Sequence, residues 1–210
     1  MRMRNKPWAM DFLNEHGHIV DTDSSYAGNI QGFFPSKQPI HVEIGTGMGS
    51  FIIEMAKRNP GINYVGIELD KNVLIRVVEK VKEQELDNIK LVLLDARKLE
   101  EYFGEEEVER IYLNFSDPWP KNRHEKRRLT HEGFLEGYRK IMYREGHVEF
   151  KTDNRSLFEF SLRSMNNYGM AFEEVILDLH ADEPPENIRT EYENKFSAQG
   201  NKIYRLKASF

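Results

Sequence analysis

Hydrophobic and polar positions divide the chain into an N-terminal segment without a clear period and a longer part in which apolar runs alternate with amphipathic stretches. We expect residues 1–39 to form an irregular arm. The amphipathic stretches predict helices at 50–59, 71–86, 130–144 and 154–168. The short apolar runs predict strands at 40–44, 63–68, 89–94, 110–115, 147–151, 172–179 and 202–209.

Alternation of strands and helices at this spacing is typical of an α/β fold, with parallel strands joined by crossover helices. The last two predicted strands have no long helix between them, so one of them can run antiparallel. We find no internal repeat, low-complexity tract or linker in the sequence. The sequence therefore predicts a single domain over residues 1–210.

Composition narrows the class of protein. The chain is 39% hydrophobic and 31% charged, as expected for a water-soluble cytoplasmic protein. It has no cysteine, which excludes disulfides, thiolate metal sites and a cysteine nucleophile. Its net charge of −5 means that any binding to nucleic acid must come from a local basic patch. The basic N-terminus is not followed by an apolar run, so the sequence predicts neither a signal peptide nor a membrane span.

Three glycines follow the first predicted strand, in the segment Glu43-Ile-Gly45-Thr-Gly47-Met-Gly49. Glycine allows a tight turn and close approach of a ligand, and the next helix offers free N–H groups. A dinucleotide fingerprint would have glycine or alanine in place of Ser50, and Glu43 would repel a pyrophosphate. The sulfonium and ammonium of S-adenosyl-L-methionine fit Glu43 better. The alternative is a turn that binds nothing, with Glu43 paired to a basic neighbour.

Each of the first four predicted strands carries an acidic residue at or near its carboxyl end, namely Glu43, Glu68, Asp95 and Asp117. In open α/β sheets, ligands bind at this edge. Glu68 follows Gly45 at about the 20-residue spacing of a ribose-binding acid. Asp95 can accept a hydrogen bond from an adenine amino group. The alternative for Glu68 and Asp95 is a helix cap, a role that we assign to Asp70 for the helix at 71–86.

A stiff Pro-Trp-Pro turn follows Asp117, and a dense basic run follows the turn. Such a cluster in an acidic chain suggests that a polyanion is brought up to a reactive centre. The alternative is a solvated loop. Trp119 can either stack on a base or anchor the turn in the core. The basic run comprises Lys121, Arg123, His124, Lys126, Arg127 and Arg128.

The sequence from Asn114 to Arg128, together with Glu43-x-Gly45-x-Gly47, closely resembles the bacterial tRNA (guanine-N7-)-methyltransferase family, also called TrmB. The segment Phe150-Lys-Thr-Asp153-Asn and the segment Thr190-Glu-Tyr-Glu193, followed by Lys195-Phe196 and Gly200, extend the resemblance over residues 40–210. The main departure is Glu125, an acid within a run that is usually more basic in the family.

This resemblance implies a Rossmann-like class I methyltransferase fold: a seven-stranded, mostly parallel sheet with one antiparallel strand and helices on both faces. It implies transfer of a methyl group from S-adenosyl-L-methionine to N7 of a guanosine in the variable loop of tRNA. By matching position, it implies cofactor contacts at Glu43, Gly45, Gly47, Glu68, Asp95 and Asp117, with Asp117 also catalytic. It implies substrate contacts at Lys121, Asp153, Thr190, Glu191, Tyr192 and Glu193, and an RNA-interacting segment of Arg123, His124, Lys126, Arg127 and Arg128.

Some of these residues have a structural alternative. Asp153 can be the N-cap of a helix beginning at Asn154. Thr190 and Glu193 have the spacing of a capping box. The histidines show no metal-ligand spacing, so we expect no metal site. The N-terminal arm either closes over the RNA or cofactor or is disordered until they bind. The sequence fits a monomer or a homodimer.

Guanine N7 has a free lone pair and no proton to lose, so we expect Asp117 to position the reactants and stabilise charge rather than act as a base. Two other functions stay open. One is a methyltransferase that acts on another RNA base or on a small molecule. The other is an RNA-binding module that has kept the fold and lost catalysis, which the full set of strand-end acids disfavours.

Overall fold

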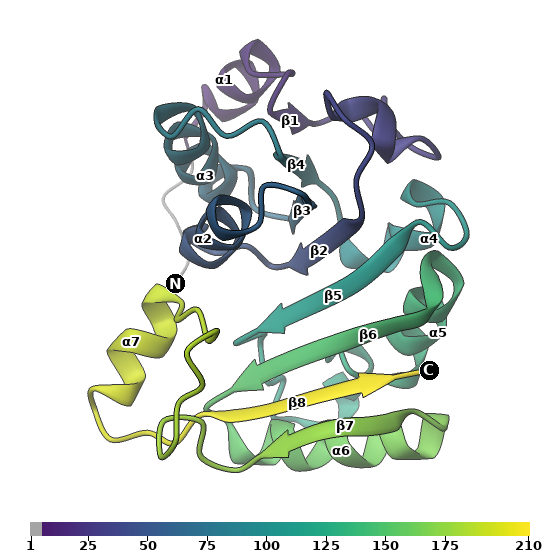
Figure 1. Ribbon diagram of the computed structural model, residues 1–210, viewed down its shortest axis with the longest axis vertical. Helices are drawn as coiled ribbons and strands as arrows, with labels where there is room; N and C mark the ends of the chain where they lie inside the picture. The colour runs from purple at the N-terminus through teal and green to yellow at the C-terminus, as the bar shows by residue number, and fades with distance from the viewer. Residues whose placement is uncertain (1–5) are drawn as a thin grey trace.

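One eight-stranded sheet organises the protein, and the computed structural model describes residues 6–210. Figure 1 shows the sheet, whose strand order is β1-β4-β3-β2-β5-β6-β8-β7. Within the described residues β8 is the one antiparallel strand, pairing with β6 and β7. The expected mostly parallel sheet is confirmed, but the strand count of seven is corrected to eight because the two-residue β1 pairs with β4. The strands are β1 (Val20–Asp21), β2 (Ile40–Ile44), β3 (Asn63–Glu68), β4 (Ile89–Leu93), β5 (Val108–Asn114), β6 (Met142–Thr152), β7 (Ala171–Ile176) and β8 (Tyr204–Ser209).

Helices cover both faces of this sheet, as expected (Figure 1). Alternate residues of each strand face opposite sides, so Tyr64 packs in the core under α1–α3 while Val65 packs in the core under α4–α6. No helix within residues 6–210 has the length and apolar character to cross a membrane. The α-helices are α1 (Ala9–Glu15), α2 (Ser50–Arg58), α3 (Lys71–Glu83), α4 (Leu99–Tyr102), α5 (Glu132–Ile141), α6 (Arg155–Tyr168) and α7 (Glu191–Ser197), and the 3-10 helices are η1 (Ile30–Phe33), η2 (Ala96–Lys98) and η3 (Asn122–Arg127).

The N-terminal segment is more ordered than expected. Residues 6–39 contain α1, β1 and η1, so the prediction of an irregular arm is wrong for this part. Ala9 and Leu13, one turn apart on α1, are fully buried against α3. A helix of two turns offers too few apolar positions for its period to be recognised in the sequence. Arg2 and Arg4, which the arm prediction included, lie outside the described residues.

The end of α5 also differs from the prediction. The sequence predicts a helix to residue 144, with Gly146 as the residue that closes it, but the helix ends at Ile141 and β6 begins at Met142. Gly146 lies inside the strand, where a Cβ atom would come within 2.8 Å of the backbone oxygen of Glu109. This glycine therefore permits close approach of β5 and β6 rather than a helix cap.

The order of the strands creates a switch point between β2 and β5. The chain leaves β2 toward β3 and β4 on one side, and it later returns to β5 and β6 on the other side. At such a point the loops that follow the two central strands diverge and leave a crevice at the carboxyl ends. The functional site is therefore expected beyond Ile44 and Asn114, which end β2 and β5.

Candidate functional site

A cleft of about 900 Å³ lies at this edge of the sheet. The loops that follow β2, β3, β4 and β5 all contribute to its walls. Among the predicted cofactor residues, Gly45, Gly47, Glu68, Asp95 and Asp117 line the cleft, together with Asn114, Phe115, Trp119, Lys126 and Arg127. Glu43 is buried and does not line the cleft itself. Its side chain accepts a hydrogen bond from Asn114, which does line it.

The glycine loop needs glycine for its backbone conformation. Gly45 and Gly47 have positive φ angles of 83° and 51°, which an L side chain adopts only with strain. A Cβ atom on either residue would meet no atom within 4 Å, so the space beside the loop is open. Gly49, with φ 79°, precedes α2, and a Cβ there would come within 2.7 Å of Val77 on α3. The loop is thus open toward the cleft and tightly packed against α3.

Glu43 is a buried acid with incomplete hydrogen bonding. Its Oε1 accepts a hydrogen bond from Nδ2 of Asn114 at 2.9 Å, across the switch point between β2 and β5. Its Oε2 is buried and has no partner among the described residues. Burial raises the pKa of Glu43 to about 8. An unpaired carboxyl oxygen next to the glycine loop suits a cationic ligand. Glu43 forms no ion pair with a basic residue among the described residues, because its partner is the amide of Asn114 and the nearby Lys151 is paired with Glu193.

Glu68 and Asp95 line the cleft from the ends of β3 and β4. Glu68 Oε1 accepts hydrogen bonds from the backbone nitrogens of Leu69, at 2.8 Å, and Asp70, at 3.0 Å, and the residue lines the cleft. Burial raises the pKa of Glu68. Asp70 is the N-cap of α3, as predicted. Asp95 caps η2 and forms an ion pair with Arg97, whose hydrogen bond lowers the pKa of Asp95. The capping alternative thus holds for Asp95, although its carboxylate also lines the cleft.

The turn that carries Asp117 is strained and externally supported. Phe115 and Trp119 have positive φ angles of 51° and 41°. Arg128 Nε donates to the backbone oxygen of Pro118 at 3.2 Å, and its Nη2 donates to that of Trp119 at 3.0 Å. Arg128 is only 9% exposed, unlike its basic neighbours. The structure therefore assigns Arg128 to the support of the turn, where the resemblance had implied an RNA contact.

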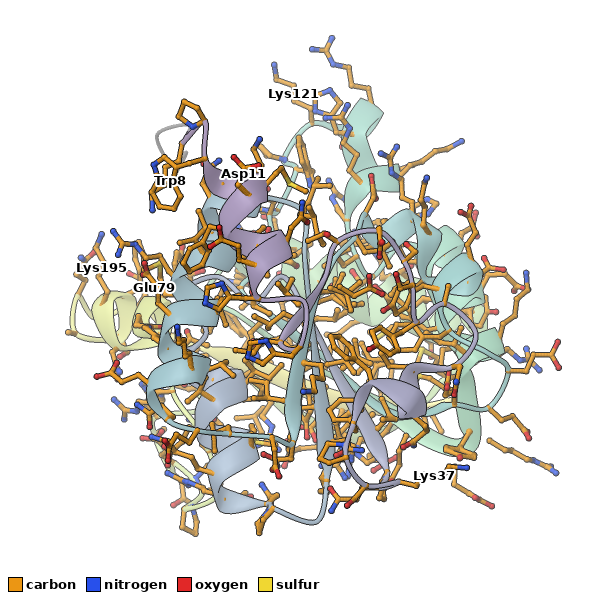
Figure 2. The ribbon with its side chains drawn as sticks, turned by 90° about the horizontal axis from the view of Figure 1, so that it is seen from above. Trp8, Asp11, Lys37, Glu79, Lys121 and Lys195 are labelled. Carbon is orange, nitrogen blue, oxygen red and sulfur yellow. The ribbon has the colours of Figure 1, made fainter. Side chains whose placement is uncertain are left out.

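The rest of the basic run forms a surface rim beside the cleft. Lys121 projects away from the protein at the edge seen in Figure 2. The guanidinium of Arg127 lies over the ring of Trp119 at 4.7 Å, and His124 meets that ring edge-on at 5.8 Å. Trp119 is therefore packed between Arg127 and His124 at the rim and still lines the cleft. The exposed cations of this rim are Lys121, Arg123, Lys126 and Arg127.

Helix α7 brings the last predicted substrate residues to the cleft's border, but not all of them face outward. Thr190 is its N-cap, and its hydroxyl accepts a hydrogen bond from the backbone nitrogen of Glu193 at 2.9 Å, as a capping box requires. The side chain of Glu193 does not complete the box. It is 0% exposed and accepts from Lys151 Nζ at 2.7 Å and contacts His180 Nε2 at 2.9 Å. Glu193 therefore anchors α7 to β6 and cannot touch a substrate in this conformation.

Like Glu191, Tyr192 is exposed. It is 42% exposed, and its ring lies 5.0 Å from that of Phe115 and 4.1 Å from that of Phe196. Burial and the nearby Asp153 raise the pKa of Tyr192. The cap of α6 is Asn154, so the capping alternative for Asp153 is wrong. Asp153 is instead half-buried beside Tyr192 and accepts a hydrogen bond from Asn201 at 3.2 Å.

Sequence reasoning missed two polar residues that organise the site. Asn114 holds Glu43, and Lys151 donates hydrogen bonds to Glu193 and, at 2.9 Å, to the backbone oxygen of Ile188. Both lie at or next to the carboxyl end of a parallel strand. For Asn114 the available signal was a polar side chain directly after the apolar residues 111–113, whereas Lys151 lies in a strand with several other charged residues and gave no such signal.

Three potential metal ligands, His180, Glu183 and Glu193, come within 4.8 Å of one another in the described part of the chain. Arg189 forms an ion pair with Glu183, and Lys151 forms one with Glu193. These cations neutralise both carboxylates, so the cluster is accounted for by its protein partners.

Comparison with known proteins places this geometry in a family. A family profile described as "Putative methyltransferase" matches residues 37–206. A tRNA (guanine-N(7)-)-methyltransferase of Macrococcus caseolyticus is 58% identical over 100% of both chains. The protein of the same name from Staphylococcus carnosus is 53% identical, also over 100% of both chains.

Solved structures agree on the fold. An antibiotic-related methyltransferase has a TM-score of 0.64 at 20% identity, covering 87% of this chain and 93% of the other. The 16S rRNA methyltransferase KamB has a TM-score of 0.65 at 13% identity, with 87% and 92% covered. These two likenesses show the methyltransferase fold alone, whereas the full-length relatives are similar enough to define the family. The chain belongs to the tRNA (guanine-N7-)-methyltransferase family.

Proposed function

We propose that this protein transfers a methyl group from S-adenosyl-L-methionine to N7 of a guanosine in tRNA, and that the guanosine lies in the variable loop. The observation that carries the proposal is the placement of a basic rim directly beside a cleft that is lined by strand-end acids. Family membership supports the same reaction. We also propose a cytoplasmic location and a monomeric or homodimeric state.

The residues of the cleft fit this cofactor. The partnerless Oε2 of Glu43 is a buried carboxyl oxygen whose charged form a cationic ligand would favour, and the carboxylate of Glu68 lines the cleft, where it can accept from ribose hydroxyls. The left-handed backbone of Gly45 and Gly47 leaves room for close approach. When bound, S-adenosyl-L-methionine supplies a methyl group that is already activated by its sulfonium.

Little proton transfer is needed from the protein. Guanine N7 is an acceptor with a free lone pair, so no base is required for its attack on the methyl group. Positive charge develops on the guanine ring, and a nearby carboxylate stabilises that charge. Asp117 is exposed on its supported turn at the cleft, which suits this role, and Asp153 beside Tyr192 can assist. Holding the two reactants in line is then the main source of rate enhancement.

The exposed rim supplies attraction for RNA. Lys126 and Arg127 line the cleft, and Lys121 and Arg123 are exposed in the same short segment, in a protein of net charge −5. Contacts of such cations with phosphates release counterions, so tRNA binding should weaken as salt is raised. Lys121 directly follows the strained turn and is exposed, which suits a contact with the RNA substrate.

The test is to incubate unmodified tRNA with the protein and a labelled methyl donor, digest the tRNA and identify the modified nucleoside. We expect N7-methylguanosine at one position in the variable loop. A methyl group on another base, or equal activity on free nucleosides, would contradict the proposal. Lack of binding to S-adenosyl-L-methionine at high micromolar concentration would favour an RNA-binding module.

A further inference from the structure

Glu191 of α7 contacts Ser50, the first residue of α2, directly after the glycine loop. Ser50 Oγ donates a hydrogen bond to Glu191 Oε2, and Lys80 Nζ from α3 donates to Glu191 Oε1 at 3.0 Å. The same ammonium group donates to the backbone oxygen of Met48 at 2.6 Å. Glu191 and Lys80 thus bracket residues 48–50 from two different helices.

This part of the loop has little stiffness of its own. Gly45, Gly47 and Gly49 all have positive φ angles, and glycine loses more conformational freedom on ordering than any other residue. Backbone hydrogen bonds from Gly45 to Ile67, at 2.8 Å, and from Gly49 to Thr46, at 2.9 Å, fix the two ends. Between these ends, Lys80 holds the carbonyl of Met48.

The helix that presents Glu191 is itself firmly held. On its buried side, Glu193 is paired with Lys151 of β6 at 2.7 Å. At the border of the cleft, Tyr192 packs on Phe115 of the turn after β5. Because α7 is anchored at these points, Glu191 is a fixed support for the loop rather than a mobile surface side chain.

We propose that Glu191 and Lys80 are positioning residues, which hold the glycine loop in the conformation that binds the cofactor, and that Glu191 is not an RNA contact. The inference rests on the proposed function in that it takes this loop to bind S-adenosyl-L-methionine. A loop that is ordered before binding loses less entropy when the cofactor binds. Both carboxylate oxygens of Glu191 are already engaged by protein donors, which leaves the residue poorly suited to an additional substrate contact.

The test uses Glu191→Gln and Lys80→Met, separately and combined, in the full-length protein. We expect each single variant to bind S-adenosylhomocysteine about three- to tenfold more weakly in calorimetry without RNA, as befits a half-exposed ion pair with an added hydrogen bond. The loss of affinity in the double variant should be smaller than the two single losses combined, because both changes remove the ion pair between Glu191 and Lys80. In turnover, KM for the methyl donor should rise while kcat at saturating donor stays unchanged.

Glu54→Gln is the matched control. It breaks an exposed ion pair with Arg58 on α2, at 2.7 Å, that does not touch the loop, so affinity should be unchanged. Ser50→Ala removes one hydrogen bond to Glu191 without changing any charge, and it should weaken binding about twofold. These substitutions are at the surface, so thermal midpoints should match that of the wild type.

Two outcomes would overturn the inference. In the first, Glu191→Gln binds S-adenosylhomocysteine as tightly as the wild type but has a raised KM for tRNA, which would make Glu191 a substrate contact. In the second, the effects of Glu191→Gln and Lys80→Met are additive. If the wild type itself failed to bind S-adenosylhomocysteine, the proposed function would fail along with the inference. If the wild type and all variants bound S-adenosylhomocysteine equally tightly, the inference would be wrong and the proposed function would stand.

Discussion

At the scale of single residues, Glu43 shows how burial can prepare a site for a cation. Its carboxyl group has one amide donor and a second oxygen without a partner. Burial favours the neutral form and raises its pKa from 4.5 to about 8. A cationic ligand beside it would favour the charged form again, so binding of S-adenosyl-L-methionine should release a proton near neutral pH.

The variant Glu43→Gln tests this. In the wild type the folded state holds the proton that the unfolded state has lost, so its stability should fall as pH rises from about 4.5 to about 8. The variant should lack this fall and should bind the cofactor about 10- to 100-fold more weakly, because it has no charge. Denaturant unfolding across this pH range, with cofactor calorimetry in buffers of different ionisation enthalpy, measures both. An unchanged pH slope in the variant would argue against a protonated Glu43.

Asp117 and Arg127 lie close together in the sequence, but substituting them should affect different steps, catalysis for Asp117 and tRNA binding for Arg127. Asp117→Asn should lower kcat at saturating tRNA by about 100-fold or more, since it removes charge stabilisation at the reacting ring. Arg127→Ala should instead weaken tRNA binding and reduce the slope of log K against log salt by about one unit. Steady-state kinetics and binding titrations at several salt concentrations separate the two effects. Lys57→Ala, which removes an exposed cation on α2, is the control for general charge.

At the scale of elements, the turn after β5 depends on a residue that belongs to the basic run by sequence only. Arg128→Ala would leave the backbone oxygens of Pro118 and Trp119 without their donors. We expect the unfolding free energy to fall by about 1–3 kcal/mol and kcat to fall with it, while the salt dependence of tRNA binding is unchanged. Chemical denaturation of this variant beside Arg127→Ala, which should keep full stability, provides the measurement. A loss of salt dependence in Arg128→Ala would restore its role as an RNA contact.

The same turn shows where sequence reasoning works and where it stops. The strand that precedes it, the acid at its end and the exposed cations beyond it follow from local patterns, and the structure places Glu68, Asp95 and Asp117 around one cleft. The burial of Arg128 does not follow from those patterns, since adjacent arginines look alike until tertiary packing separates them. The end of α5 was misplaced for a related reason. Gly146 is required by the neighbouring strand, which lies far away in the sequence.

At the scale of the whole molecule, a buried ion pair connects helix α7, which lies near the C-terminus in the sequence, to strand β6 of the sheet. Lys151 Nζ and Glu193 Oε2 are 2.7 Å apart, and their side chains are 6% and 0% exposed. Burial lowers the pKa of Lys151, and although burial alone would raise the pKa of Glu193, the charge of Lys151 keeps it below its usual value. The pair thereby sets the position of α7, and through α7 that of Tyr192 and Glu191.

Replacing one member of this pair should lower the unfolding free energy much more than replacing both. Lys151→Met leaves the carboxylate of Glu193 buried without its cation, so we expect a loss of about 3–5 kcal/mol in unfolding free energy. In Lys151→Met combined with Glu193→Leu, the buried charge is gone and most of this loss should be recovered, although His180 and Asn187 lose their acceptor. Denaturant unfolding of the wild type and three variants gives the coupling energy. Additive losses would show that the pair does not act as a unit, and α7 would then owe its position to the packing of Tyr192 on Phe115 and to the contacts of Glu191.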